Sequence, residues 1–313
     1  MIINILKKHQ ISFFFAKLVI FLLLIGLMDF AIGSILKHFY FKQSSGILSR
    51  TTYSIESTNE DILIFGTSRA NHHYISELIE NELNIKTYNV GSDGKPIFYH
   101  YAVLNCIIKR YTPKIIIFDF YPFEFENYND SWEKISSLLP YYDSHPEIRE
   151  IIDNRSFFEK YKLKISKIYP YNSLLLKIAI SNFELNNKRN NQESDIKGYI
   201  PLNGFLKDSL DKFPIHSEEL DLQKIEYFEN FIKVCNENKI KLYIFVSPYY
   251  AISSQEIPSI NECSKIAKKY NIFFKSYIND SLFINNNKFF ISEDHLNEDG
   301  AKVYTKLIIE DIK

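Results

Sequence analysis

Between residue 61 and the C-terminus, short apolar runs alternate with amphipathic stretches, and this alternation limits the possible folds more than any other feature. Strands that alternate with helices build a parallel sheet covered on both faces, so the sequence predicts an α/β domain with five parallel strands. The runs expected to be strands are Asp61–Phe65, Ile85–Val90, Lys114–Asp119, Lys241–Ser247 and Ile272–Ser276. The stretches with apolar residues at three- and four-residue spacing, expected to be helices, are Ala70–Leu83, Pro96–Tyr111, Ser217–Asn238, Pro258–Tyr270 and Glu298–Ile312.

The third and fourth predicted strands are separated by far more chain than a crossover helix needs. We interpret Pro122–Pro214 as a mostly helical insertion, with helices expected at Ser156–Ile168 and Asn172–Asn182. Ligands of open α/β folds bind at the carboxyl edge of the sheet. We therefore expect these helices to pack over that edge, where they either shape a substrate groove or cover the sheet.

The N-terminal segment Leu18–Leu36 is apolar except for one charge, Asp29. A helix of this length, at about 1.5 Å rise per residue, matches the ~30 Å hydrocarbon core of a membrane. More lysines precede the segment than follow it, which favours a cytoplasmic N-terminus. We predict a single-pass anchor at residues 1–43 and an extracytoplasmic domain at residues 44–313. A signal peptide cleaved before Ser34 and a buried core helix are the alternatives.

Charge and cysteine content argue against two classes of protein. The 37 basic and 38 acidic residues are scattered and give a formal net charge of -1, so no basic surface for nucleic acid is expected. Cys106, Cys235 and Cys263 are widely separated and fit neither a disulfide framework nor a metal knuckle. We expect no nucleic-acid partner, no metal and no cofactor.

Ser68 follows the first predicted strand directly, within the sequence GTSRAN at residues 66–71. A hydroxyl at a strand-to-helix turn lies at the carboxyl edge of the sheet, where free N–H groups and the positive helix end can stabilise an oxyanion. Ser68 is therefore either a nucleophile or only the cap of the following helix.

His295 lies in the loop before the last predicted helix, within the sequence EDHLNEDGA at residues 293–301. Loops at the carboxyl edge converge, so His295 is expected to meet Ser68. It would take the proton from Ser68 as general base and return it to the leaving group, while Asn297 caps the helix. The two residues together favour a nucleophilic serine over a capping role.

The blocks GTSRANHHY and EDHLNEDGA resemble the first and last sequence blocks of the SGNH/GDSL hydrolase family. The resemblance implies a flavodoxin-like three-layer α/β/α sandwich whose serine uses the C-terminal histidine. It extends to NVGSDG at residues 89–94, where the family's glycine donates an N–H to the oxyanion hole. This role carries over to Gly91, beside the N–H of Ser68. The order of elements fits from about Asp61 to Lys313, apart from the insertion.

The chain resembles one membrane-anchored branch of that family in three features. These are the predicted anchor, the motif Ser-Arg-Ala-x-His-His and the long insertion. The branch includes the D-alanyl-lipoteichoic acid biosynthesis protein and the alginate O-acetyltransferases. The resemblance implies a cell-envelope glycan or glycopolymer as substrate and a membrane-bound acyltransferase system as partner.

The orienting acid of the family pattern is missing at its usual place, three residues before His295, where this chain has Ser292. We therefore predict a Ser–His dyad supported by Ser292 or a nearby carboxylate. Glu293 and Asp294 are expected to be poor substitutes, because a residue adjacent to the histidine on an extended loop usually points elsewhere.

The oxyanion asparagine of the family pattern is also missing, because the third strand is followed by DFYP at residues 119–122. An additional donor would then come from Asn71, Tyr121 or Asn127. Loss of one such donor typically costs on the order of 10²–10³ in rate, which is compatible with a slow or specialised enzyme.

Three other polar side chains follow Ser68 closely. His72 and His73 have no carboxylate or cysteine at ligand spacing, so we expect surface or substrate contacts from them and no metal site. Arg69 pairs either with an anionic group of the substrate or with a carboxylate at the sheet edge such as Asp119.

These observations lead to two hypotheses from different classes. The first is a membrane-anchored extracytoplasmic serine esterase or O-acyltransferase that forms an acyl-enzyme at Ser68. Its substrate would be an acyl group, with acetyl favoured, on a cell-envelope glycan or on an acylated small molecule. The second, suggested by the missing aspartate and asparagine, is a catalytically inactive SGNH-like protein that binds glycan or assembles with an acyltransferase.

Overall fold

Five parallel strands form one sheet in the computed structural model, which describes residues 2–127, 130–186, 196–207, 219–251 and 256–313. The strands are β1 (Ile62–Gly66), β2 (Thr87–Asn89), β3 (Ile115–Asp119), β4 (Lys241–Val246) and β5 (Phe273–Ser276). Their order in the sheet is β2-β1-β3-β4-β5, and every neighbouring pair is parallel. This is the flavodoxin-like order, so the predicted fold class is confirmed.

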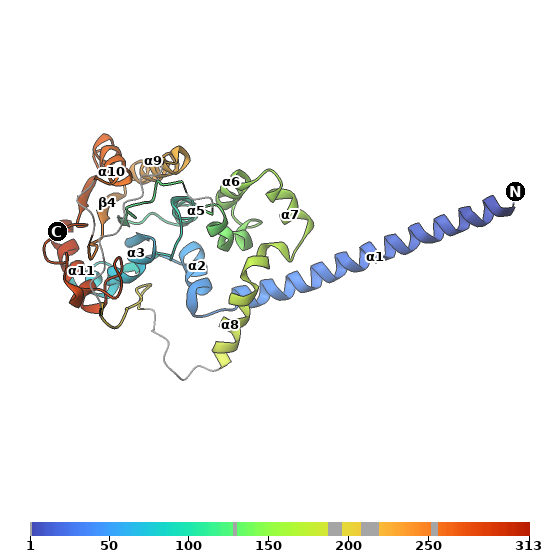
Figure 1. The fold of residues 1–313 in the computed structure, drawn as a ribbon, viewed down its shortest axis with the longest axis horizontal. Coiled ribbons are helices and arrows are strands. Elements are labelled where there is room, and N and C mark those ends of the chain that lie inside the picture. The colour runs from blue at the N-terminus through green and yellow to red at the C-terminus, as the bar shows by residue number, and fades with distance from the viewer. Residues whose placement is uncertain (1, 128–129, 187–195, 208–218, 252–255) are drawn as a thin grey trace.

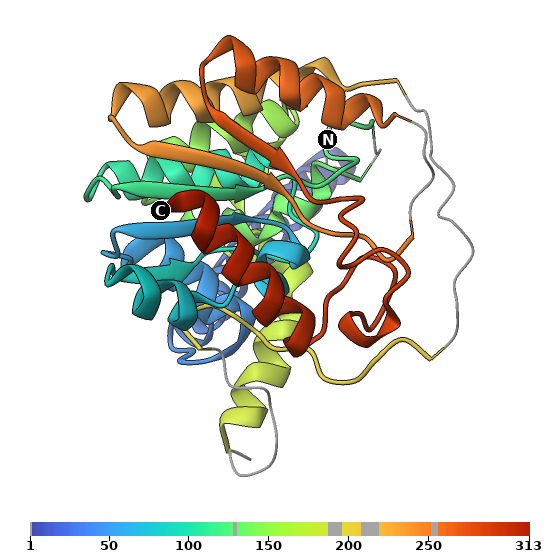
Figure 2. The same cartoon turned by 90° about the vertical axis from the view of Figure 1, so that its left-hand side faces the viewer.

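Helices cover both faces of the sheet because the strands are apolar on both sides. In β1, Leu63 and Phe65 point into one hydrophobic cluster, and Ile62 and Ile64 point into the other. Figure 2 shows the long helices α9 and α10 on one side of the sheet and α11 on the other. The first cluster is covered by α2 (Gly46–Glu56), α5 (Ile97–Ile108), α9 (Leu222–Glu237) and α10 (Pro258–Lys269). The second is covered by α3 (Ser68–His73), α4 (Ser76–Leu83) and α11 (Glu298–Ile312).

Helix ends differ from the sequence prediction where a side chain binds the backbone. The single helix predicted at 70–83 is divided into α3 and α4, and the Ile75 N–H at the break donates to the Thr305 hydroxyl at 3.1 Å. Helix α9 begins at Leu222 because the Asp221 carboxylate accepts from the next N–H groups as an N-cap. Part of the predicted start, residues 217–218, lies outside the described residues. Asn297 caps α11 as predicted, accepting from the Gly300 N–H at 2.9 Å.

The described part of the insertion is mostly helical, as predicted, and its helices differ in their position relative to the carboxyl edge of the sheet. Its elements are η1 (Glu133–Tyr141), α6 (Pro146–Arg155), α7 (Glu159–Ile165), η2 (Tyr169–Leu174) and α8 (Leu175–Asn186). In Figure 1, α7 and α8 lie beside the base of the N-terminal helix. Leu163 of α7 and Ile178 of α8 are buried in the same cluster as Tyr40. The predicted position over the sheet edge is therefore wrong for α7, which packs against α6 and η2. Ser173 of η2 and Lys177 of α8 do line a cavity that adjoins the pocket of Ser68, as expected for helices that shape a groove.

The segment between the N-terminal helix and β1 contains helix α2, which the sequence did not predict. Leu48 and Ile55, seven residues apart, lie on one face of α2 and are buried, while Arg50 of the same helix is also buried. The helix therefore belongs to the domain core and brings Arg50 close to the carboxyl edge of the sheet.

Helix α1 (Ile2–Phe41) projects from the domain in Figure 1 and is long and apolar enough to cross a membrane. Its apolar side chains from Ile11 to Met28 are exposed, so the alternative of a buried core helix is wrong for this part. Its last turns differ, because Tyr40 is fully buried against the insertion.

Candidate active site

Ser68 stands at the first position of α3, one residue after a turn that requires glycine. Gly66 ends β1 with φ +138°, and a Cβ there would lie 2.6 Å from the Asp119 carbonyl oxygen of β3. The chain can therefore turn tightly beside β3 only with glycine at this position. The turn places the Ser68 hydroxyl at the carboxyl edge of the sheet, at the start of a helix.

His295 reaches Ser68 from the loop before α11. The Ser68 hydroxyl lies 2.8 Å from Nε2 of the His295 ring. The loop is held on both sides of the histidine, because the Ile291 N–H donates to the His295 carbonyl at 2.9 Å and the Leu296 N–H donates to His73 Nε2 at 3.0 Å. The structure thus brings together the two side chains that the sequence paired.

Asp294 contacts the other ring nitrogen, contrary to the sequence expectation. Its Oδ1 lies 2.8 Å from Nδ1 of His295, and the Ser292 hydroxyl lies 3.0 Å from the same nitrogen. The expectation that Asp294 points elsewhere assumed an extended loop, but Phe290 and Leu296 form an antiparallel bridge that folds residues 291–295 into a tight bend. The bend turns the Asp294 carboxylate back onto the ring. Glu293 makes no hydrogen bond to the ring in the described part of the chain.

The charge of Asp294 fixes which ring nitrogen carries the proton. Burial acts to raise the pKa of the Asp294 carboxyl, but hydrogen bonds from His295 and Ser292 outweigh it and leave this pKa below its ordinary value. The Ser292 hydroxyl donates to the carboxylate at 2.9 Å. An ionised carboxylate accepts only, so Nδ1 of His295 carries the hydrogen and Nε2 is free to accept from Ser68.

The oxyanion donor predicted at Gly91 is wrong in this structure. The Gly91 N–H donates to Asn89 Oδ1 at 2.9 Å, so it is already bonded. Gly94, three residues later, lines the pocket that contains Ser68, has φ +63°, and its N–H makes no hydrogen bond to any described residue. The Ser68 N–H lies in the first turn of α3, where backbone donors lack helical partners. The N–H groups of Ser68 and Gly94 are therefore two backbone donors at this pocket that have no partner among the described residues.

Of the three side chains considered as further donors, only Tyr121 lines this pocket. Asn71 is bonded elsewhere: its Oδ1 accepts from Arg50, and its Nδ2 donates to Asp93 Oδ1 at 2.8 Å. Asn127 is exposed and is not among the lining residues. The hydroxyl of Tyr121 makes no hydrogen bond within the described ranges, so it can donate to a bound molecule.

Arg69 is fully buried beneath the site and is paired with Asp119, one of the two partners considered from the sequence. Its Nη2 lies 3.4 Å from Asp119 Oδ2 and donates to the Phe120 carbonyl at 2.7 Å. Its guanidinium lies between the rings of Tyr121 and Tyr249, 5.3 and 5.2 Å from their centroids. Because the Arg69 side chain is fully buried, it stabilises the residues around the site and does not contact substrate.

His72 and His73 make structural contacts rather than substrate contacts. His73 is fully buried, and burial together with the neighbouring His295 and Arg69 lowers its pKa well below the usual value. It is therefore neutral and can accept the Leu296 N–H through Nε2. His72 Nδ1 lies 2.8 Å from the carbonyl of Ile200.

The pocket above Ser68 has a volume of about 330 Å³ and contains charged residues that the sequence did not single out. Burial raises the pKa of Glu124 to about 7, although Lys224 lowers it in part. Burial and the nearby Lys177 lower the pKa of Lys95 to about 8. Glu124 and Lys224 come from segments with no recognisable motif, so no sequence signal could have identified them.

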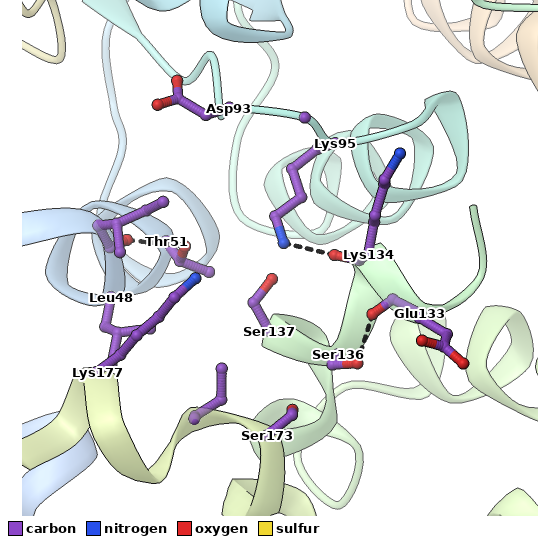
Figure 3. A pocket seen from close by; sticks show the side chains of 13 residues that line it. Leu48, Thr51, Asp93, Lys95, Glu133, Lys134, Ser136, Ser137, Ser173 and Lys177 are labelled. Atoms are coloured by element: carbon purple, nitrogen blue, oxygen red, sulfur yellow. Dashed lines mark hydrogen bonds between the residues drawn. The ribbon is translucent and has the colours of Figure 1, made fainter. Parts of the chain in front are cut away.

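An adjoining cavity of about 360 Å³ shares Gly94, Lys95 and Lys134 with the Ser68 pocket. Figure 3 shows Lys95, Lys177 and the Ser137 hydroxyl around this cavity, and they come from the loop before α5, from α8 and from η1. The hydroxyl oxygen of Ser137 is buried and has no hydrogen-bond partner among the described residues. The two spaces together give a groove that begins at Ser68 and is lined by both polar and apolar side chains.

No protein-family model matches this sequence, and no curated protein sequence matches it. Solved structures with a similar arrangement include a psychrotrophic esterase from a Pseudoalteromonas species. This structure has 10% identity and a TM-score of 0.41, and the match covers 80% of this chain and 95% of the esterase. A lipase/acylhydrolase from Enterococcus faecalis has 11% identity and a TM-score of 0.40, with 80% of this chain and 94% of the other covered.

An acetyl xylan esterase is similar at 10% identity and a TM-score of 0.39, over 80% of this chain and 100% of the esterase. Identities and TM-scores of this size do not bear on what the site binds or catalyses. The side chains around Ser68 do.

Proposed function

We propose that this chain is a serine esterase or O-acyltransferase that forms an acyl-enzyme at Ser68. The observation that supports the proposal is the continuous chain of contacts from the Ser68 hydroxyl through His295 to the Asp294 carboxylate, 2.8 Å at each step. This arrangement of nucleophile, base and orienting acid activates serine on unrelated folds. It gives the site a complete triad with Asp294 in place of the acid missing three residues before the histidine.

The proposed reaction has two steps that use the same groups. His295 Nε2 takes the Ser68 proton as Oγ bonds to the ester carbonyl carbon, and the oxyanion that forms accepts from the N–H groups of Ser68 and Gly94. The C–O bond to the leaving alcohol then breaks, and the alcohol takes the proton from His295. In the second step His295 deprotonates water or an acceptor hydroxyl, whose oxygen bonds to the acyl carbon. The bond from that carbon to Ser68 Oγ then breaks, and His295 returns the proton to Oγ.

The groove favours a short acyl group on a hydroxyl-rich molecule such as a glycan. The adjoining cavity is lined by four hydroxyl side chains and three lysines together with the apolar Ile47, Leu48 and Leu174, so its apolar part is short. The polar residues are Thr51, Ser136, Ser137, Ser173, Lys95, Lys134 and Lys177. Hydroxyl and ammonium groups suit sugar hydroxyls and their substituents, whereas a long acyl chain would need an apolar channel. An acetylated cell-envelope glycan, or a smaller acylated sugar, is the substrate that we propose.

The N-terminal helix supports a position on the outer side of a membrane. Helix α1 is long and apolar enough to span, and more lysines precede its apolar part than follow it. A membrane-bound acyltransferase is then a suitable acyl donor or partner, in line with the resemblance to the branch of lipoteichoic acid and alginate modification proteins. Both the orientation and the partner belong to the proposal.

Covalent labelling tests the proposal directly. A fluorophosphonate added to the full-length chain is expected to attach to one residue, Ser68, as identified by peptide mass spectrometry, because only an activated serine reacts rapidly with such a reagent. No label on a folded chain that still binds acetylated glycan would contradict the proposal. That result would instead support the alternative of a catalytically inactive glycan-binding protein.

Tyr121 is expected to contribute a third oxyanion contact. Removing its hydroxyl in Tyr121→Phe should lower kcat for acetyl ester hydrolysis by up to about 10²-fold, with a smaller change in KM. Tyr249→Phe is the matched control, since both rings lie against Arg69 but only Tyr121 lines the Ser68 pocket. Equal effects of the two substitutions on kcat would show that Tyr121 acts only through Arg69.

A further inference from the structure

Helix α1 is hydrogen-bonded to the insertion through Asp29, the single acidic residue of its apolar segment. Asp29 accepts hydrogen bonds from the Ser166 hydroxyl and the Lys167 N–H, both at 2.6 Å, and from the Ile168 N–H at 3.4 Å. One turn later, a Cβ on Gly33 would lie 2.4 Å from the backbone of Lys167. The contact is therefore close enough to fix the position of α1 against the loop that follows α7.

The fully apolar stretch of α1 ends at this contact, although Phe30, Ile32, Ile35 and Phe39 beyond it are still exposed. From Ile11 to Met28 its apolar side chains are exposed, and this length corresponds to about 27 Å of helix, close to the ~30 Å hydrocarbon core of a membrane. Asp29 follows immediately, with its carboxylate satisfied by the loop after α7. If residues 11–28 span the membrane, the loop at Ser166 must lie at the membrane surface.

Helix α7 and the residues before it carry an apolar patch next to this loop. We define the α7 patch as Phe157, Phe158, Tyr161 and Ile165, which are 68%, 63%, 44% and 82% exposed. Ile165 precedes Ser166 directly, so the patch lies beside the level of Asp29. The ring of Phe157 lies against those of Phe158 and Tyr161, with centroids 5.3 and 5.7 Å away.

Lysines surround the α7 patch. Lys160 lies over the rings of Phe157 and Tyr161, and Lys162, Lys164 and Lys167 are exposed nearby. Aromatic rings bordered by lysines are typical of helices that lie in the headgroup region, where the rings enter the acyl boundary and the ammonium groups meet lipid phosphates. In Figure 1 the helix lies at the end of the domain from which α1 projects, which is where a bilayer would be.

We propose that the α7 patch rests in the outer headgroup region of the phospholipid bilayer that α1 spans, so that the domain is held in one orientation and not on a flexible tether. The inference rests on the proposed membrane anchor and goes beyond the proposed activity. Its consequence is that the groove at Ser68 faces a fixed direction relative to the membrane.

Site-specific fluorescence on the full-length protein in vesicles tests this position. The three native cysteines are buried, so Ile165→Cys, Leu222→Cys and Leu22→Cys can each be labelled with the environment-sensitive fluorophore NBD. Leu222 is the matched control because it is 78% exposed on α9, and Leu22 reports whether α1 is inserted. The vesicles contain phosphatidylcholine, a minority of phosphatidylglycerol, and brominated lipid as quencher.

We expect strong quenching of the probe at Leu22. The probe at Ile165 should be quenched severalfold more than the probe at Leu222, and its emission should be blue-shifted. A probe at Ile165 that behaves like the one at Leu222, with Leu22 quenched, would overturn the proposal while the anchor stands. Absence of quenching at Leu22 would overturn the anchor and the proposal together. Ester hydrolysis plays no part in this signal, so a failure of the proposed activity would be seen separately.

Two glycine substitutions in α1 test whether the contact at Lys167 is what holds the α7 patch at the membrane. Gly33→Val should displace the loop at Lys167 and reduce quenching at Ile165 to the level of Leu222, with Leu22 still quenched. Gly26→Val should leave all three signals unchanged, because a Cβ at Gly26 meets nothing within 4 Å. Quenching at Ile165 that persists in Gly33→Val with its loop displaced would contradict the fixed orientation.

Discussion

Replacing Ser68 with alanine in the full-length chain should lower kcat/KM for p-nitrophenyl acetate by at least about 10³-fold, to the level that binding and the oxyanion donors alone can sustain. His295→Ala should cause a loss of the same size, because the Ser68 hydroxyl is a poor nucleophile unless Nε2 of His295, 2.8 Å away, accepts its proton. The double variant should be no slower than either single one, since the two residues act as a unit.

Ser131→Ala is the matched control for this loss. Ser131 is a buried serine that lines the same pocket, so its substitution removes a hydroxyl of the same kind without removing the contact to the imidazole. Its rate should stay close to that of the parent, with all variants showing the parent's thermal unfolding. A Ser68→Ala chain that keeps the parent's rate would show that the hydrolysis is not carried out by this serine.

The positions of the strands along the chain could be predicted because buried parallel strands are apolar throughout, as in Ile62–Gly66, and are separated by helices with an apolar face of their own. The place of the insertion could not be predicted. The sequence indicates that the insertion contains helices with apolar residues, but what covers α8 depends on α1, whose last turns carry the buried Tyr40. A helix interpreted only as an anchor gives no reason to expect that its end belongs to the domain core.

Site residues could be predicted where they lie directly at the end of a strand or just before a helix. Ser68 after β1 and His295 before α11 are such positions, and the structure brings them together. The conformation of a loop has no comparable sequence signal. Gly91 and Gly94 lie in the same short segment, and only the structure shows that Asn89 occupies the N–H of one and leaves the other free.

Asp294→Asn is the substitution that separates a triad from a dyad. The amide cannot act as a charged acceptor for Nδ1–H of His295 or stabilise the imidazolium that forms during the reaction, so kcat should fall by about 10²–10⁴-fold with little change in KM. Because the hydrogen bonds from His295 and Ser292 hold the Asp294 pKa below its ordinary value in spite of burial, the parent carboxylate is charged throughout the neutral pH range in which kcat is measured.

Ser292→Ala and Glu293→Gln complete the test. They alter the other two residues that the sequence offered as partners to orient the His295 ring. Ser292 donates its proton to the Asp294 carboxylate, so its loss should weaken the positioning of that group and cost less than about tenfold in kcat. Glu293→Gln should change kcat little, because its backbone carbonyl, not its carboxylate, makes the contact to the Tyr250 N–H. If Ser292→Ala were instead the most damaging of the three, the serine would be the orienting group and the contact from Asp294 to the ring would be incidental to catalysis.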